Sequence, residues 1–387
     1  MRASGIVFLF FWENKFVSVD FLTLLCYYEN KKEQSMKMLA FRSSGIKLVL
    51  LSLMHFVTDG LCSFLVFSKL YPNNAPLAIL IFFAYNILAF VTQSPVGILL
   101  DKYNKPKLFL AISMGAILAG YLLSDFCIIS VVLIGLSNSI FHVAGGKYVT
   151  DKSGNDISHL GIFVSTGAIG LVLGQRYLSF AFMPYIFFLI LFACGFLVIF
   201  LEDSETKSYS EKYESKNGSA LALVAVIAVV AIRSFVGKVV APDFTLSGHI
   251  FLVMSVATAL GKAMGGICSK FFGIKTTTYI SMIVASLCLT LGAGSMPLFI
   301  LGIFAFNFSM PITLYFANIL LKGSEGFAFG TLAAALIPGY FIAMSFTYSI
   351  AVRICTVALC ILSMVVMIIV SKRIKYDAGS ADINHNS

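Results

Sequence analysis

The sequence predicts an all-α polytopic membrane protein, with twelve transmembrane helices arranged as two six-helix repeats. Three observations lead to this fold class. Hydrophobic residues make up 59% of the 387 residues and charged residues only 12%, with a mean hydropathy of +0.94, whereas soluble domains carry roughly 45–50% apolar and about 25% charged residues. The apolar residues form repeated windows of membrane length, and the basic residues gather in alternate loops. This composition excludes a water-soluble enzyme.

The first segment, residues 1–35, differs from the rest of the chain. Polar residues such as Glu13 and Asp20 interrupt its apolar runs before any reaches membrane length. A signal peptide would keep a clean apolar stretch and small residues at a cleavage site, and this segment has neither. We therefore expect residues 1–35 to be a misassigned start, with the protein beginning at Met36 or Met38, or else a disordered leader.

From Met36 onward, windows of about 19 apolar residues predict twelve spans. They are 46–70, 77–100, 106–123, 127–146, 158–179, 181–201, 219–240, 244–265, 274–292, 296–320, 325–348 and 350–371. The longest polar interval separates the sixth span from the seventh, as a solvated linker between two bundles would. The expected domains are an N-terminal six-helix bundle at 36–201, a cytoplasmic linker at 202–218, a C-terminal six-helix bundle at 219–376 and a cytoplasmic tail at 377–387.

Basic residues set the orientation, because Lys and Arg in short loops stay on the cytoplasmic side. With both termini in the cytoplasm, most basic residues fall on the cytoplasmic side. Among them are Lys262, near the inner end of the predicted eighth span, and Lys270 and Lys275 after that span. The outer side keeps only Lys69, Arg176, Arg233, Lys238 and Arg353. The formal net charge of +9 is therefore a topology signal, and we expect no nucleic-acid partner.

The sequence carries no signature of enzymatic or metal chemistry. The eight cysteines have no C-x-x-C spacing and read as small hydrophobic residues. The chain has no H-E-x-x-H motif, no phosphate-binding loop and no dinucleotide fingerprint, and its five histidines are scattered. We expect no enzyme activity, no cofactor and no metal site.

Two loops share one pattern. GILLDKYNKPK at 97–107 lies between the second and third spans, and GGICSKFFGIK at 265–275 lies between the eighth and ninth. The alignment pairs Gly97 with Gly265, Asp101 with Ser269, Lys102 with Lys270 and Lys107 with Lys275. Parallel repeats of a six-helix half build alternating-access carriers, whose substrate site lies between the repeats.

With this motif the chain resembles the major facilitator superfamily, whose cytoplasmic loop reads G-x-x-x-D-(K/R)-x-G-x-(K/R)-(K/R). The first copy departs from it at Lys105, which replaces the inner glycine, and the second copy has Ser269 in place of the acid. The resemblance implies a conformational role for Gly97, Asp101, Lys102, Lys107, Gly265 and Lys270.

Further motifs narrow the resemblance to the fosmidomycin resistance protein branch of that superfamily. They are MHFVTDG at 54–60, SNSIFHVAGGKYVTD at 137–151 and AIRSFVG at 231–237. Val143 stands where that branch usually has proline. The resemblance covers 46–371 and implies a bacterial inner-membrane exporter of drugs or other small organic compounds, exchanging them for protons and conferring antibiotic resistance.

Ionisable residues inside a span are expensive and therefore mark functional candidates. Asp59 is the one carboxylate well inside a predicted span, and His55 lies one helical turn earlier on the same face. We predict that Asp59 and His55 form the proton-coupling site. The alternative for Asp59 is a structural hydrogen bond between helices.

Arg233 lies in the seventh span at about the depth of Asp59 in the first. This placement predicts that Arg233 pairs with Asp59, directly or through substrate, or binds an anionic group; the alternative is snorkelling to the outer interface. His142, in the fourth span, contacts substrate or packs structurally. Further substrate-binding candidates are Asn86, Gln93, Asn307 and Tyr315.

Three functions remain open at this point. The first is proton-coupled export by alternating access. The second is an uptake symporter for a small organic anion, with Arg233 as the anchor, and the third is a nontransporting membrane scaffold or receptor. The expected partners are a small-molecule substrate, protons and the lipid bilayer, and the expected oligomeric state is a monomer.

Overall fold

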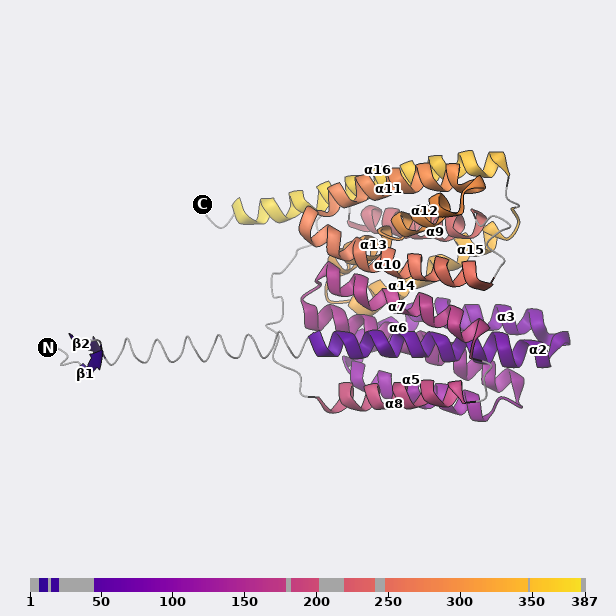
Figure 1. Ribbon diagram of the computed structural model, residues 1–387, viewed down its shortest axis with the longest axis horizontal. Coiled ribbons are helices and arrows are strands. Elements are labelled where there is room, and N and C mark those ends of the chain that lie inside the picture. Colours follow the sequence, from indigo (N-terminus) through magenta and orange to yellow (C-terminus); the bar gives the residue numbers. More distant parts are fainter. Residues whose placement is uncertain are drawn as a thin grey trace.

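The computed structural model describes residues 7–12, 15–20, 45–178, 182–201, 219–240, 248–346 and 349–383. The predicted linker 202–218 and part of the predicted leader lie outside the described residues. Within the leader, β1 (Val7–Trp12) pairs antiparallel with β2 (Lys15–Asp20). The rest of the described chain is a bundle of long helices that run side by side (Figure 1).

The first six predicted spans correspond to six helical segments. These are Gly45–Asn73, which includes η1 (Phe64–Leu70) and α2 (Tyr71–Asn73); Ala75–Tyr103, which includes η2 (Ala75–Leu77), α3 (Ala78–Asn86), η3 (Ile87–Val91) and α4 (Gln93–Tyr103); α5 (Pro106–Leu122); α6 (Cys127–Ser153); α7 (Ile157–Arg176); and α8 (Met183–Phe200). We refer to Gly45–Asn73 as the first helix.

The last six predicted spans also correspond to helical segments. These are α9 (Ser219–Val239), α10 (Gly248–Phe272), α11 (Ile274–Leu291) followed by η5 (Gly292–Gly294), α12 (Met296–Phe306) with α13 (Ser309–Leu320), α14 (Glu325–Ala334) with α15 (Leu336–Ala343), and α16 (Ile350–Ile383). In the described part of the chain, 11 helices are long and apolar enough to cross a membrane, and the shorter apolar helix Pro106–Leu122 supplies the remaining predicted span.

Several helix boundaries differ from the prediction. The sequence places the end of the fourth span at residue 146, but α6 continues until Gly154 adopts a left-handed conformation with φ of 62°, the usual way for a helix to end. The eleventh span divides into α14 and α15, since Pro338 provides no backbone N–H for the preceding turn. The last helix continues to Ile383, past the predicted end at residue 371.

The most extensive contacts between the first six helices and the last six are those of α7 with α10 and of α4 with α14; α6 also contacts α14, and α7 also contacts α13. Figure 1 shows the helices up to α8 on one side of the bundle and those from α9 on the other. Small residues allow the two sides to approach closely. A Cβ added at Gly161 would lie 2.7 Å from the carbonyl oxygen of Lys262 on α10.

The pair formed by the second and eleventh segments is in contact at both ends. At one end the rings of Phe83 and Phe341 lie 5.1 Å apart. At the other end the Asp101 carboxylate accepts a hydrogen bond of 2.9 Å from the Gly326 backbone N–H. The interface along this pair is therefore closed at both faces of the bundle.

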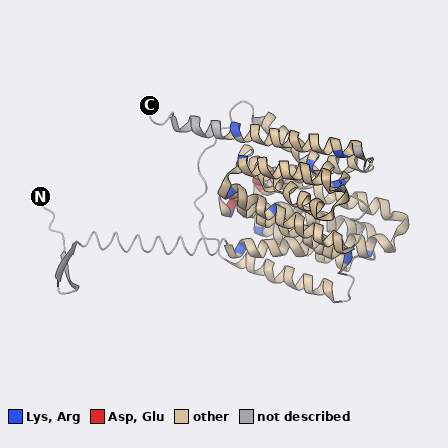
Figure 2. Cartoon of the chain, turned by 45° about the horizontal axis from the view of Figure 1, so that its top comes forward, with Lys and Arg blue, Asp and Glu red and all other residues tan. Residues whose placement is uncertain are grey.

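The α7–α10 pair is also closed at both ends. The Arg176 guanidinium lies 5.7 Å from the centre of the Phe251 ring at one end, and Lys270 Nζ lies 2.5 Å from Asp156 Oδ2 at the other. Figure 2 shows acidic residues in red, among basic ones in blue, toward the end where the two chain termini leave the bundle. Both pairs are therefore in contact at each of their two ends.

Candidate functional site

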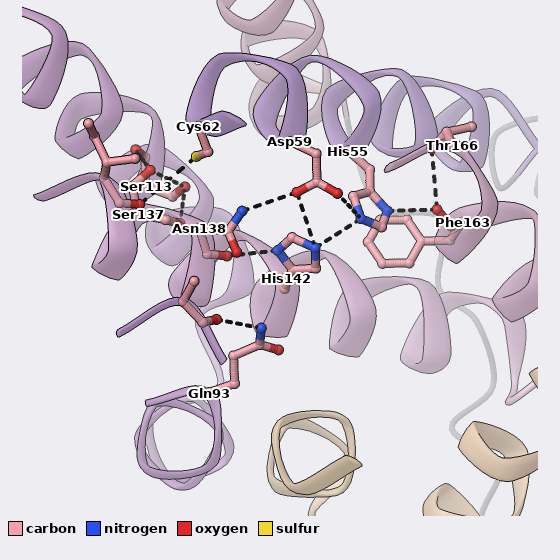
Figure 3. Close-up of polar contacts among 12 residues, drawn as sticks. His55, Asp59, Cys62, Gln93, Ser113, Ser137, Asn138, His142, Phe163 and Thr166 are labelled. Atoms are coloured by element: carbon pink, nitrogen blue, oxygen red, sulfur yellow. Dashed lines mark hydrogen bonds and ion pairs between the residues drawn. The ribbon is translucent and has the colours of Figure 1, made fainter. Parts of the chain in front are cut away.

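His55 and Asp59 on the first helix face His142 on α6 in the interior of the bundle (Figure 3). His55 Nε2 lies 2.9 Å from His142 Nε2. One carboxylate oxygen of Asp59 lies 3.4 Å from His55 Nε2, and the other lies 3.5 Å from His142 Nε2. The exposed fractions of the three side chains are 5%, 13% and 15% for His55, Asp59 and His142. We call these three residues the central cluster.

Backbone carbonyls fix the tautomers of both histidines. His55 Nδ1 donates to the Phe163 carbonyl at 2.8 Å, and His142 Nδ1 donates to the Asn138 carbonyl at 2.8 Å. Because a carbonyl oxygen can only accept, each Nδ1 carries the hydrogen and a neutral ring directs the Nε2 lone pair into the cluster. The Asn138 side-chain amide also donates to Asp59 at 3.1 Å, which orients the carboxylate.

The cluster therefore turns three hydrogen-bond acceptors toward one another, the two Nε2 atoms and the Asp59 carboxylate. None of the three side chains places a hydrogen between them. Two Nε2 lone pairs at 2.9 Å repel each other unless a cation lies between them, and a shared proton fits this distance. The carboxylate of Asp59 adds negative charge beside the two rings. The sequence predicted Asp59 and His55 as partners, and the tertiary structure adds His142 to them.

Glycines on α7 leave room for the cluster. A Cβ at Gly167 would meet the Asp59 carboxylate and the His55 ring, and a Cβ at Gly170 would meet the backbone carbonyl of Phe56. Backbone therefore packs against backbone here, as small residues permit in membrane helices. The glycines at 167 and 170 on α7 thus permit its close contact with the first helix.

Arg233 on α9 is buried, with 9% of its surface exposed. Its guanidinium donates to the Thr313 hydroxyl at 3.2 Å. Within the described residues, the ion-pair partners of Asp59 are His55 and His142, so the direct Asp59–Arg233 pair is not formed in this conformation. An indirect pairing through substrate stays a prediction.

Lys262 is a functional candidate that the sequence analysis assigned to the cytoplasmic anchors. It lies within α10, well before that helix ends at Phe272, and its ammonium interacts electrostatically with His142, Asp59 and Arg233. The signal was present in the sequence, since Lys262 falls inside the predicted eighth span. Only the packing of α10 against α7 shows that it faces the interior.

The weaker substrate candidates make local contacts. The side-chain amides of Asn86, Gln93 and Asn307 each donate to the carbonyl four residues earlier in the same helix, at 2.8, 2.7 and 2.8 Å. The ring of Tyr315 lies 6.3 Å from that of Phe316. Because these contacts do not tie the four residues to the central cluster, their role in substrate binding stays a prediction.

The first copy of the repeated loop connects the two sides of the bundle. The Asp101 carboxylate accepts hydrogen bonds from the backbone N–H groups of Gly326 and Phe327 at 2.9 and 2.8 Å. Both N–H groups lie in the first turn of α14, where an anion is favoured by the helix dipole. Lys147 lies 3.3 Å from Asp101 and 3.3 Å from Glu325, so this cation bridges both sides.

Other residues of the first loop have separate contacts. A Cβ at Gly97 would clash with the Gly326 backbone, so glycine permits the close approach of α4 to α14. The Lys102 ammonium lies 5.6 Å from the Tyr103 ring. Lys107 donates to backbone carbonyls at the end of α8, at 3.1 and 2.9 Å, and so connects α5 to α8 within the first six helices.

The second copy of the repeated loop also connects the two sides of the bundle. Here the loop supplies the cation, Lys270, and the opposite side supplies the carboxylate, Asp156. Lys270 pairs with Asp156, which caps α7 by accepting the Ser158 N–H at 2.8 Å. Burial by itself raises the pKa of Asp156, but the nearby His159 ring and the hydrogen bonds from Lys270 and Ser158 together hold that pKa well below its usual range.

The remaining residues of the second copy explain the missing acid. A Cβ at Gly265 would clash with the Phe308 backbone. Ser269 occupies the position of Asp101, and its buried hydroxyl has no partner among the described residues. The carboxylate of this connection comes instead from Asp156, across the interface.

Comparisons with known proteins support the fold. No family model matches the chain, and no curated protein matches it. The Escherichia coli fucose:proton symporter is 12% identical, with a TM-score of 0.61 over 85% of this chain and 99% of that chain. The human organic anion transporter MFSD10 is 15% identical, with a TM-score of 0.61 over 85% and 99%. A bacterial homologue of the iron transporter ferroportin, in an outward-facing state, is 15% identical, with a TM-score of 0.57 over 84% and 98%.

The chain thus has the all-helical fold of the major facilitator superfamily transporters. This confirms the predicted fold class and agrees with the apolar helices of a multi-pass membrane protein. At these identities the likeness concerns the fold alone, and the fosmidomycin resistance branch stays a prediction.

Proposed function

We propose that this chain is a secondary active transporter of a bacterial inner membrane that exports small organic compounds in exchange for protons. The observation that carries the proposal is the central cluster, where two imidazole lone pairs and a carboxylate converge in the interior of the bundle. Such a cluster requires a cation, and a proton is the cation that every aqueous phase supplies. The motifs at 54–60 and 137–151 supply all three residues of this cluster, which supports the proposed place in the fosmidomycin resistance branch.

Asp59 and His55 hold the transported proton in this proposal, and His142 shares it. Protonation from the predicted outer side neutralises the repulsion within the cluster and permits closure. Opening toward the predicted cytoplasmic side releases the proton and exposes the site to the compound to be exported. In the alternating-access cycle proposed here, the contacts at one end of the helix pairs open while those at the other end stay closed.

The substrate carries an anionic group in this proposal. Arg233 and Lys262 bring two cations to the interior from the last six helices, and the hydroxyl of Thr313 is the hydrogen-bond partner of Arg233. Burying a cation away from an acidic partner is costly, so an anionic substrate stabilises this arrangement. A phosphonate accepts the forked guanidinium donors of an arginine well.

The alternative is a proton-coupled uptake symporter for a small organic anion. The same Arg233 and Lys262 favour it, because an imported anion would bind them as well as an exported one. The two mechanisms differ in the direction of substrate relative to protons. A nontransporting scaffold or receptor would produce no proton-dependent flux in either direction.

Purified protein in proteoliposomes distinguishes these functions. A proton gradient is imposed, and the flux of a labelled phosphonate drug is followed together with internal pH. Export by antiport predicts that the drug moves against the proton direction, whereas symport predicts movement with it. Full, pH-independent transport by Asp59→Asn would refute the coupling role, with Asp125→Asn, an exposed carboxylate just after the end of α5, as the control.

We call Arg233 and Lys262 the anion site, and its role is tested with variants of both residues and a matched control. Arg233→Gln and Lys262→Gln are expected to abolish transport of the phosphonate drug, since each removes a cation that would bind the anionic group. Arg373→Gln removes an arginine that is exposed on α16 and is expected to transport at the wild-type rate. Equal losses in Arg233→Gln and Arg373→Gln would contradict the anion site.

A further inference from the structure

We propose that the central cluster of His55, Asp59 and His142 is a binding site for a divalent transition-metal ion, with Zn²⁺ as the best-fitting ion. All three residues offer a ligand atom, and these atoms lie within 4.8 Å of one another. The proposal of a metal site depends on the geometry of the cluster and does not depend on the direction of transport. Its ligands come from helices that are far apart in the sequence, which explains why spacing alone did not reveal it.

The distances fit a single ion. Zinc binds imidazole nitrogen and carboxylate oxygen at about 2.0–2.2 Å, so ligand atoms around one ion are separated by about 3.0 Å in octahedral and about 3.4 Å in tetrahedral geometry. The separations here are 2.9 Å between the two Nε2 atoms, and 3.4 and 3.5 Å from each Nε2 to its nearer Asp59 oxygen. Three ligands are thus in place with little movement of the side chains.

The ligands are also oriented as metal ligands are. Metal-binding histidines almost always donate their other ring N–H to a carbonyl or carboxylate, which directs the free lone pair at the ion. His55 does so to Phe163 and His142 does so to Asn138, both at 2.8 Å. The Asn138 amide orients the Asp59 carboxylate at 3.1 Å. Both imidazoles are therefore in the tautomer that coordination requires.

The ligand set favours a transition metal over Mg²⁺ or Ca²⁺. The two hard cations prefer all-oxygen ligand sets, whereas imidazole suits zinc, iron, nickel and copper. Three protein ligands also leave at least one position of the ion open, as in catalytic zinc sites.

The surrounding charges point to an anionic ligand in that open position. Two neutral imidazoles and one carboxylate leave a divalent ion with one net positive charge. Lys262 adds positive charge beside the cluster, and Arg233 in turn adds positive charge beside Lys262. An anionic donor bound to the ion offsets this excess, so we expect metal binding to strengthen when a small organic anion is present. This last expectation rests on the anion site proposed above, while the metal site itself does not.

The test uses the full chain, purified in detergent with its affinity tag removed and its metal stripped. Calorimetric titration with ZnCl₂, without substrate or a proton gradient, is expected to show one ion per chain. X-ray absorption at the zinc edge is expected to show two imidazoles, with Zn–N at about 2.0–2.1 Å. His142→Ala and His55→Ala are expected to weaken binding by at least about tenfold, the lower end of the effect of losing a metal-site partner.

His249→Ala is the matched control, since this histidine is exposed near the start of α10 and its variant is expected to bind zinc as the wild type does. Binding that is equal in His142→Ala and wild type, or equally weakened in His249→Ala, would overturn the proposal, as would an absorption spectrum without imidazole ligands. If His142→Ala does not elute as a folded protein, His142→Gln keeps the side-chain volume and is expected to show the same loss of zinc.

The failure of this proposal and the failure of the transport proposal are distinguishable. Proton-coupled flux that persists in the presence of a chelator, in a protein that binds no zinc, would refute the metal site alone. Tight zinc binding in a protein whose Asp59→Asn variant transports at full rate would refute proton coupling alone.

Discussion

Replacing Asp101 with asparagine tests whether the first loop holds the two sides of the bundle together. The carboxylate accepts two backbone N–H groups of α14 and lies 3.3 Å from Lys147. Hydrogen bonds to a charged group contribute about 1.5–3 kcal/mol each. The asparagine side chain would keep one acceptor oxygen, so we expect a loss of about 2–4 kcal/mol from one such bond and the Lys147 pair together. Since 1.4 kcal/mol is tenfold in an equilibrium constant, the ratio of closed to open molecules falls about 30- to 700-fold.

Distances between spin labels measure this ratio. Labels at Tyr103→Cys and Phe272→Cys report on the predicted cytoplasmic ends of α4 and α10, because both residues are exposed; the native cysteines are replaced beforehand. Asp101→Asn is expected to move the population toward longer distances. Asp151→Asn is the control, since Asp151 pairs with the same lysine but lies on the same helix, at 3.4 Å. An unchanged distribution in Asp101→Asn, or an equal shift in Asp151→Asn, would refute the reasoning.

Three further predictions concern packing and charge. Gly167→Ala inserts a methyl group against the central cluster. It is expected to lower the free energy of unfolding by about 1–3 kcal/mol and to abolish transport, whereas Gly115→Ala, which faces open space, is expected to do neither. Equal melting temperatures of the two variants in detergent would contradict the packing role of Gly167. Ser269→Ala removes an unpaired buried hydroxyl and is expected to leave the melting temperature unchanged or higher, in contrast to Ser113→Ala, which breaks hydrogen bonds of 2.9 and 3.2 Å. The lowered pKa of Asp156 means that its stabilisation is complete above the unfolded carboxyl pKa of about 4 and is lost as pH falls below that value. The difference in melting temperature between wild type and Asp156→Asn is therefore expected to stay constant from pH 7 to about pH 5, and a difference that vanishes in that interval would show that the carboxylate is not held by these bonds.

Asp59 and Lys262 show how far the sequence could predict the site. An ionisable residue in an apolar helix stands out, and the i,i+4 spacing already placed His55 beside Asp59. Lys262 is equally visible inside the predicted eighth span, but a lysine near a helix end reads as a topology signal. The difference between an anchor and an interior charge depends on which face of α10 meets α7.

His142 shows what the sequence could not predict. Its contact with His55 joins residues on two helices, and neither helix pattern fixes the rotation of one against the other. That rotation is set by close backbone contacts, such as that of Gly170 with Phe56. A single sequence shows that small residues are present but not which helix they contact.

The sequence by itself determined that this protein lies in a membrane, how many helices span it and which residues would be costly inside it. These follow from the transfer of single residues from water to lipid, which is a local property of the chain. The tertiary structure decided that His55, Asp59 and His142 form one cluster and that Asp156 supplies the acid missing at Ser269. Both depend on contacts between distant helices, whose energies come from packing and charge pairing that no single segment contains.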